Sequence, residues 1–522
     1  MNAFFMKVLS LISAALMLIM SPGGHIRQPI ESKSCPAYYG APAEINYLGE
    51  VEGFEHPYLA PEISNGMHGN SYNTGAYSAC GPLGVNPVVK SRSMNVFGGL
   101  VATLMFDSKG RIMCISGNVV GFRLLLMDAD TLEILCETRL PQRASTLEFF
   151  KTLDFSNISN DTSGGAYCHL LKGDRPLIAN SENKVQIYYV DETSGKPEWK
   201  IEKEWDVNPY LPEGSYMTDA IPDYDGNIWF VTRPGEVGVI DKNDEIHIMK
   251  LENEEIQNTL AVCDDGIYIV SDYAMYRFEL DENNDPVFTW RTEYDRGTTL
   301  KPGAINQGSG TTPTLLDVPR LDGSNTVAHL VAITDNADDR VNVVVYERET
   351  GEVLACQPVF ESGHSVSENS LIAFGRSFIV ENNYTDTGSG FLDTNPTSYP
   401  GVTRIDMNDD CTGCTVKWES QEASCTVVPK LSTGNGLVYL YTREINDDIP
   451  KNAVAWYLTA IDFETGETKY KVFTGCGRNW NNSYGPITIG PNGTAYVGVF
   501  NGLISISDSD KAPETNKNPF GC

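Results

Sequence analysis

Two acidic residues occupy equivalent places before a recurring glycine turn. Asp219 lies seven residues before Gly226, and Glu368 lies seven residues before Gly375. Amide and hydroxyl side chains accompany this position: Asn369 follows Glu368, Asn258 and Thr259 stand in the next copy after Asp219, and Asn482 lies just upstream in the last copy. Carboxylate and amide oxygens are the ligands that Ca²⁺ prefers. We therefore expect ligand-binding residues here and a calcium site that contains Asp219, Glu368 and Asn369. The alternative is that both acids bind water or cap loop amides.

The stretch NGMHGNSYNTGAYSACGPLG, residues 65–84, has five glycines, three asparagines and one histidine. Tyrosine and cysteine are unusual in disordered tethers, so we expect this loop to be held against the body of the protein. There His68 and Tyr72 would cover a bound ligand.

A second histidine, His364, lies four residues before Glu368. Because a histidine near a carboxylate can act as a general base, His68 and His364 are the candidate catalytic residues. The alternative for His364 is a solvated loop residue.

A third polar patch, AITDNADDR, places Asp335 and Asn336 at the end of an apolar run. An Asp-Asn pair in this place forms an Asx turn in many proteins, and it can also contact a ligand. The sequence leaves both readings open. There is no Gly-x-Ser-x-Gly motif and no phosphate-binding glycine loop, so serine hydrolase and nucleotide chemistry have no local support.

A repeat must position these residues, because short runs of Val, Ile, Leu, Tyr and Phe alternate with Gly, Asp and Asn turns. The glycine turn recurs at intervals of 40 to 63 residues: Gly110, Gly173, Gly226, Gly266, Gly323, Gly375, Gly436 and Gly493. An acidic turn between two further strands follows in seven of the eight units, as in VGVIDKNDEIHIM. Four strands per unit are typical of a β-propeller.

The fold class is therefore all-β, a single eight-bladed propeller, with seven blades as the alternative. The last unit lacks an outer strand, so we expect an N-terminal strand to close the ring, and the apolar run EINYLGEV, residues 44–51, is our prediction for it. In this architecture the start of each first strand points into an axial funnel, where ligands bind.

The N-terminus has one Lys before the apolar run Val8–Met20 and then a Ser-Pro-Gly-Gly break. This pattern predicts a secretory signal peptide over residues 1–24. We divide the rest into an N-terminal segment (25–95) with the closing strand and the funnel-crossing loop, the propeller (96–510) and a polar tail (511–522). No later segment is apolar for 18 residues, so we expect no membrane span in the mature protein.

Twelve cysteines agree with a secreted or extracytoplasmic location. We predict a local disulfide between Cys411 and Cys414, and one between Cys35 and Cys522 that ties the chain ends together. The formal net charge of −31 and the lack of any basic run exclude nucleic acid as a partner. We expect a monomer.

The segment LTAIDFETGETKYKVFTG resembles the repeat of quinoprotein-type propellers, Ala-x-Asp-x-x-Thr-Gly-x-x-x-Trp. Ala460, Asp462, Thr465 and Gly466 match, and Tyr470 stands in for Trp. The resemblance implies eight blades. Quinoprotein dehydrogenases also carry two adjacent cysteines over the quinone, and no two cysteines are adjacent here, which argues against pyrroloquinoline quinone as cofactor.

The function that we expect depends on the ligand that binds in the axial funnel. We expect a small-molecule or carbohydrate ligand there, with a metal-assisted hydrolase or lyase as the first hypothesis. A Ca²⁺ ion could polarise a lactone or ester carbonyl, as in gluconolactonase-type and paraoxonase-type propellers, whose arrangement is analogous although their motifs are absent. The alternatives are a non-catalytic module that binds a carbohydrate or a protein, and a divergent quinoprotein dehydrogenase. Whether the protein is an enzyme is left open.

Overall fold

The computed structural model describes residues 36–51, 55–61, 66–94, 99–118, 121–143, 145–146, 161, 163–385, 399–424, 427–444 and 454–510. The predicted signal peptide, the polar tail, Cys35 and Cys522 lie outside the described residues. No helix in the described part of the chain is long and apolar enough to cross a membrane.

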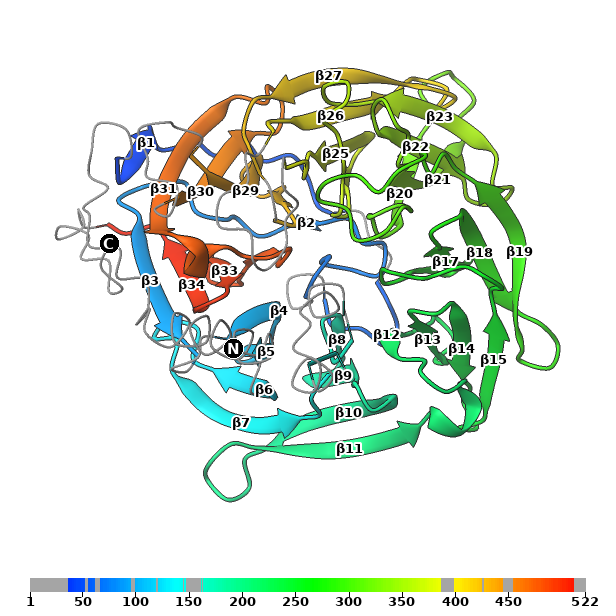
Figure 1. Ribbon diagram of the computed structural model, residues 1–522. Helices are drawn as coiled ribbons and strands as arrows, with labels where there is room; N and C mark the ends of the chain where they lie inside the picture. Colours follow the sequence, from blue (N-terminus) through cyan, green and yellow to red (C-terminus); the bar gives the residue numbers. More distant parts are fainter. Residues whose placement is uncertain are drawn as a thin grey trace, which may run out of the picture.

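Eight mainly antiparallel sheets stand around a central axis, so the eight-bladed β-propeller is confirmed (Figure 1). We number the blades in chain order. The first four consist of β4 (Leu100–Phe106), β5 (Ile112–Asn118), β6 (Gly121–Met127) and β7 (Ile134–Leu140); β8 (Cys168–Leu171), β9 (Arg175–Ala179), β10 (Lys184–Asp191) and β11 (Glu198–Asp206); β12 (Met217–Pro222), β13 (Ile228–Thr232), β14 (Glu236–Ile240) and β15 (Ile246–Lys250); and β16 (Ala261–Cys263), β17 (Gly266–Val270), β18 (Ala274–Leu280) and β19 (Pro286–Glu293).

Blades 5 to 8 follow the same order from the axis outward. They consist of β20 (Thr314–Pro319), β21 (Val327–Thr334), β22 (Asn342–Glu347) and β23 (Val353–Pro358); β24 (Ile372–Phe374), β25 (Ser377–Glu381), β26 (Val402–Met407) and β27 (Cys414–Ser420); β28 (Lys430–Ser432), β29 (Leu437–Arg443), β30 (Ala455–Asp462) and β31 (Thr468–Cys476); and β32 (Ile487–Ile489), β33 (Ala495–Val499), β34 (Gly502–Ser507) and the N-terminal β3 (Val88–Ser93). Blade 7 gains β1 (Tyr38–Gly40) outside and β2 (Ala76–Tyr77) inside. Short 3₁₀ turns, η2 (Asn208–Tyr210) and η3 (Arg478–Trp480), join blades.

The glycine turns lie between the first and second strands of the blades. All eight predicted turn glycines have positive φ, for example +93° at Gly226 and +65° at Gly375. This is the conformation that tight turns require and that L-residues rarely adopt.

An N-terminal strand closes the ring, as predicted, but it is β3 and not residues 44–51. β3 pairs antiparallel with β34, from Val88 opposite Ser507 to Ser93 opposite Gly502. Residues 44–51 form no strand; the backbone N–H groups of Asn46 and Leu48 donate to carbonyl groups of blade 7. The prediction chose the more apolar run, whereas an outermost strand is half exposed and suits the mixed sequence VVKSRS.

Packing between blades supplies the core. In blade 6 the indole of Trp418 lies over Gly466 of blade 7, and its Nε1 donates to the carbonyl of Phe463 (2.8 Å). A Cβ at Gly466 would lie 2.6 Å from the Trp418 ring, so only glycine fits there. Trp290 of blade 4 covers Gly351 of blade 5 in the same way.

The predicted Cys411–Cys414 disulfide is wrong, because both thiols are free. The side chain of Asn408 organises this turn instead: its Oδ1 accepts N–H bonds from Thr412 (3.1 Å) and Gly413 (3.2 Å). Cys411 is buried with φ +58°, while Cys414 begins β27 opposite Met407. The hairpin therefore closes without a covalent link.

The loop at residues 66–77, which we call the axial strap, is held down as predicted. It crosses the centre of the ring (Figure 1). Its successive carbonyl groups accept N–H bonds of 2.8–3.0 Å from the inner strands of four blades: Ser71 from Val262, Tyr72 from Leu315, Thr74 from Ala373 and Gly75 from Leu431. The strap thus accepts an N–H group at the inner edge of each of these four sheets.

Candidate functional site

A histidine–aspartate pair lies at the inner strands of blades 2 and 3. Nε2 of His169, in β8, lies 3.1 Å and 3.0 Å from the two carboxylate oxygens of Asp219, in β12. The Thr259 hydroxyl, from the chain that leads into blade 4, donates to the same carboxylate. Asp219 is fully buried, whereas the His169 side chain is 14% exposed. The buried acid therefore fixes the orientation of an accessible imidazole.

His169 lines a small pocket between blade 2 and the axial strap. The volume of the pocket is about 10 Å³, which leaves room for about one water molecule. The other lining residues are Leu59, Gly66, Met67, His68, Gly69, Asn70, Asn73, Tyr167 and Cys168. The exposed surface of the lining is mainly apolar, and His68, His169, Asn70 and Asn73 add its polar groups.

His68, one of the two predicted catalytic candidates, lies at the centre of the ring. Its Nε2 is 3.4 Å from the hydroxyl groups of both Thr312 and Ser370. Its Nδ1 is buried and has no hydrogen-bond partner in the described part of the chain. Burial lowers the pKa of His68 well below its usual value, and the positive charge of Lys430 adds to the effect. The imidazole is therefore neutral in the folded protein.

Glu368 lies on the blade 6 side of the axis. Nε2 of Gln257 donates to its carboxyl group at 2.8 Å, and its own backbone N–H donates to Asn383 Oδ1 at 2.7 Å. Burial raises the pKa of Glu368 to about 7, so the acid exchanges its proton near neutrality. Nearby, the Tyr167 hydroxyl donates to Oδ1 of Asn258 at 3.4 Å.

A buried acid–base pair that the sequence reasoning missed anchors the strap. Burial raises the pKa of Glu381 to about 8 and lowers that of Lys430 to about 7. Nδ2 of Asn369 donates to Glu381 Oε1 (2.5 Å), and Nζ of Lys430 donates to the carbonyl of Met67 in the strap (2.5 Å).

The residues predicted to hold calcium have separate partners. Asp219 binds His169 and Thr259, Glu368 binds Gln257, and Asn369 donates to Glu381. Within the described ranges, the group of three His, Cys, Asp or Glu side chains with closely spaced ligand atoms lies elsewhere, at the outer rim of blade 3. Calcium at the axis stays a prediction.

Three further predicted residues organise loops. Asp335 accepts N–H bonds from Ala337 and Asn342, and Nδ2 of Asn336 donates to two loop carbonyl groups, so the pair forms a turn as one reading anticipated. Asn482 is buried, and its Nδ2 donates to the carbonyl of Gly485 at 2.8 Å.

His364 and Tyr72 lie away from the small pocket. His364 stacks on Tyr399 with ring centroids 4.2 Å apart, at the base of a blade 6 loop. Tyr72 points from the strap into the core between blades 4 and 5, where its hydroxyl lies 2.9 Å from Cys263 Sγ. These contacts give both residues a packing role in this structure.

His169 was not among the predicted site residues, although the position seven residues before the turn glycine was compared in six units, including this one. In this blade that position is Ala166, and His169 lies three residues further along. The available signal was a polar residue within an inner strand, where apolar side chains prevail.

No family model matches the chain. An uncharacterized protein of Archaeoglobus fulgidus is 25% identical over 332 residues, which cover 58% of this chain and 63% of that protein. The aligned region thus spans less than two thirds of the length of this relative.

Solved structures with a similar fold include a streptogramin B lyase, with a TM-score of 0.35, 10% identity and coverage of 81% of this chain and 97% of that one. Another is Sqt1 from Chaetomium thermophilum, with a TM-score of 0.41, 11% identity and coverage of 77% of this chain and 93% of that one. A third is the Dos1 propeller, with a TM-score of 0.36, 11% identity and coverage of 81% of this chain and 95% of that one. These likenesses carry no argument about chemistry, which must come from the residues of the axial pocket.

Proposed function

We propose that the protein is a secreted propeller that binds a small polar organic ligand at its axis and acts on it as a hydrolase or lyase by acid–base chemistry. One observation carries the proposal: His169 lines the axial pocket while its Nε2 is held by the buried Asp219. A carboxylate that fixes an imidazole leaves the other ring nitrogen to exchange a proton with a ligand.

The proposed step uses residues of this chain only. In the hydrolase reaction, Nδ1 of His169 takes a proton from a bound water, which then adds to an ester or lactone carbonyl. In the lyase reaction, Nδ1 takes a proton from a carbon next to a carbonyl group, which starts an elimination. Asp219 stabilises the resulting imidazolium charge, and His169 returns the proton to the leaving oxygen. Calcium at the axis would assist as a Lewis acid, and its requirement is tested by adding Ca²⁺ or a chelator.

A non-catalytic module that binds a carbohydrate or a protein is the second candidate. Because the pocket has room for about one water molecule, both candidate functions require the strap to move before a whole ligand can enter.

The test compares turnover with binding. Purified protein is screened against lactones, p-nitrophenyl esters and oligosaccharides by thermal shift, and compounds that bind are assayed for turnover with and without Ca²⁺. We expect His169→Gln to reduce turnover at least 100-fold while the thermal shift persists. His329→Gln is the matched control, since the His329 side chain is 51% exposed and lies outside the pocket.

Unchanged turnover in His169→Gln would overturn the acid–base role. Binding without turnover of any compound would instead favour the non-catalytic module.

A further inference from the structure

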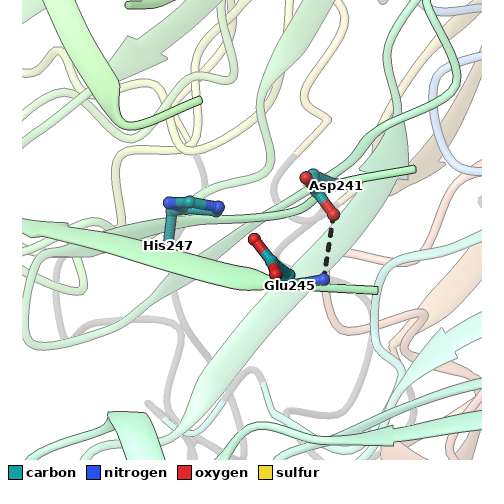
Figure 2. A group of neighbouring side chains, drawn as sticks. All are labelled: Asp241, Glu245 and His247. Atoms are coloured by element: carbon teal, nitrogen blue, oxygen red, sulfur yellow. Dashed lines mark hydrogen bonds between the residues drawn. The ribbon is translucent and has the colours of Figure 1, made fainter. Parts of the chain in front are cut away.

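A histidine and two carboxyl groups meet at the outer rim of blade 3, away from the axis. Asp241, Glu245 and His247 lie at the turn between β14 and β15 (Figure 2). Their ligand atoms all lie within 4.8 Å of one another. The imidazole edge of His247 is directed toward the two carboxyl groups.

The local sequence builds this arrangement. Asp241 Oδ1 accepts the backbone N–H groups of Asn243 (2.8 Å) and Glu245 (2.9 Å), and Asp244 takes a positive φ of +68° to close the turn. Glu245 and His247 are two residues apart in extended chain, which places both side chains on one face.

The two ring nitrogens of His247 have different surroundings. Nδ1 lies 2.9 Å from Asp285 Oδ1, in the corresponding turn of blade 4. Nε2 is buried and has no hydrogen-bond partner among the residues that the structure describes. When Nδ1 carries the proton and donates it to Asp285, Nε2 presents a lone pair toward Asp241 and Glu245. Histidine ligands of metal ions commonly donate their second N–H to a carboxylate in this way.

We propose that Asp241, Glu245 and His247 bind a divalent transition metal ion of the zinc class, with water completing the coordination. An imidazole ligand favours Zn²⁺, Ni²⁺ or Cu²⁺ over Ca²⁺, which prefers oxygen ligands alone. Blade 4 contributes to the same place, because Asn284 Nδ2 donates to Asp241 Oδ2 at 3.1 Å and Asp285 orients the imidazole. All three ligands come from blade 3, so the ion would stabilise this turn, while Asp285 and Asn284 of blade 4 support it by hydrogen bonds.

Blade 4 provides an internal comparison. Its turn repeats the pattern, with Asp281, Asn283 and Asp285 in place of Asp241, Asn243 and Glu245. Val287 occupies the place of His247, so that turn has the same shape without an imidazole ligand. The difference assigns the site to blade 3 and makes His247 the decisive residue.

The test is isothermal titration of tag-free protein with ZnCl₂ and, separately, with CaCl₂, in a buffer that does not bind metal. We expect one Zn²⁺ per chain, a Zn²⁺-dependent rise in Tm and no comparable effect of Ca²⁺. His247→Gln should weaken Zn²⁺ binding at least 100-fold, and Asp285→Asn by 10- to 100-fold, as expected for the loss of an orienting carboxylate. Asp128→Asn, in the equivalent turn of blade 1, is the matched control and should leave Zn²⁺ affinity unchanged.

The proposal fails if the wild-type protein binds no Zn²⁺, or if His247→Gln binds it as tightly as the wild type does. Circular dichroism checks that each variant is folded. Should His247→Gln not fold, Asp285→Asn decides, together with the absorption spectrum of bound Co²⁺, which must lose its intensity in that variant.

Discussion

Burial sets the protonation of the axial acids at the scale of single residues. Glu368 lies among the side chain of Gln257, the backbone N–H of Ile305 and the more distant charge of Arg233, and burial outweighs all three. Its pKa rises from 4.5 to about 7. A carboxyl group with this pKa is uncharged below about pH 7 and ionised above it.

This shift predicts a pH-dependent stability. The pKa of Glu368 is higher in the folded than in the unfolded state. Its stabilising contribution to the unfolding free energy is therefore complete below pH 4.5 and is lost as the pH rises through 7. Relative to Glu368→Gln, the wild type should therefore lose on the order of 3 kcal/mol of unfolding free energy between pH 4.5 and 8.

Urea denaturation of both proteins at several pH values measures this difference. Glu361→Gln serves as the control because Glu361 is exposed. A constant difference between wild type and Glu368→Gln across this pH range would refute the raised pKa.

At the scale of elements, the axial strap does what a regular strand could not. Its backbone bends so that successive carbonyl groups reach separate blades, and Asn73 provides the bend with a positive φ of +59°. Nδ2 of Asn73 also donates to the carbonyl groups of Leu260 and Pro313, both at 3.1 Å. One side chain thus joins the strap to the chain leading into two blades.

Two substitutions separate these roles of Asn73. Asn73→Gly keeps the permitted φ but leaves two buried carbonyl groups without their donor, so it should cost about 1–3 kcal/mol. Asn73→Ala adds the strain of the left-handed conformation and should cost about 1 kcal/mol more. Chemical denaturation of the wild type and both variants measures the cost of the lost hydrogen bonds and the cost of the backbone strain. Equal stability of the two variants would show that the backbone conformation is not under strain.

For the whole molecule, ring closure depends on segments far apart in the chain. β3 completes blade 8 beside β34, and the strap contacts the inner strands of blades 4 to 7 before the chain reaches β3. The propeller is therefore held both at its circumference and at its axis by residues that precede β4.

Two truncations distinguish the contributions of the strap and of β3. A chain that starts at residue 84 keeps β3 and lacks the strap, so we expect a monomer with a lower Tm. A chain that starts at residue 95 also exposes the edge of β34, which should pair with other molecules and aggregate. Size-exclusion chromatography with light scattering measures both outcomes. A monomeric, stable chain from residue 95 would contradict the closure by β3.

The sequence by itself determined the blades. Turn glycines and alternating strands are local signals, and hydrogen bonding between neighbours in the chain is enough to build each four-stranded sheet. The eight blades, the positive φ of the turn glycines and the held-down loop were therefore predictable.

Only the tertiary structure decided what meets at the axis and at the rim. His169 and Asp219 are 50 residues apart, Lys430 and Met67 are 363 apart, and His247 meets Asp285 of the next blade. Such pairs depend on how blades rotate against one another and on where the N-terminal chain crosses the ring. The sequence predicted a loop across the ring but not these partners, because the contacts are made by packing between sheets and not by the repeat within one sheet.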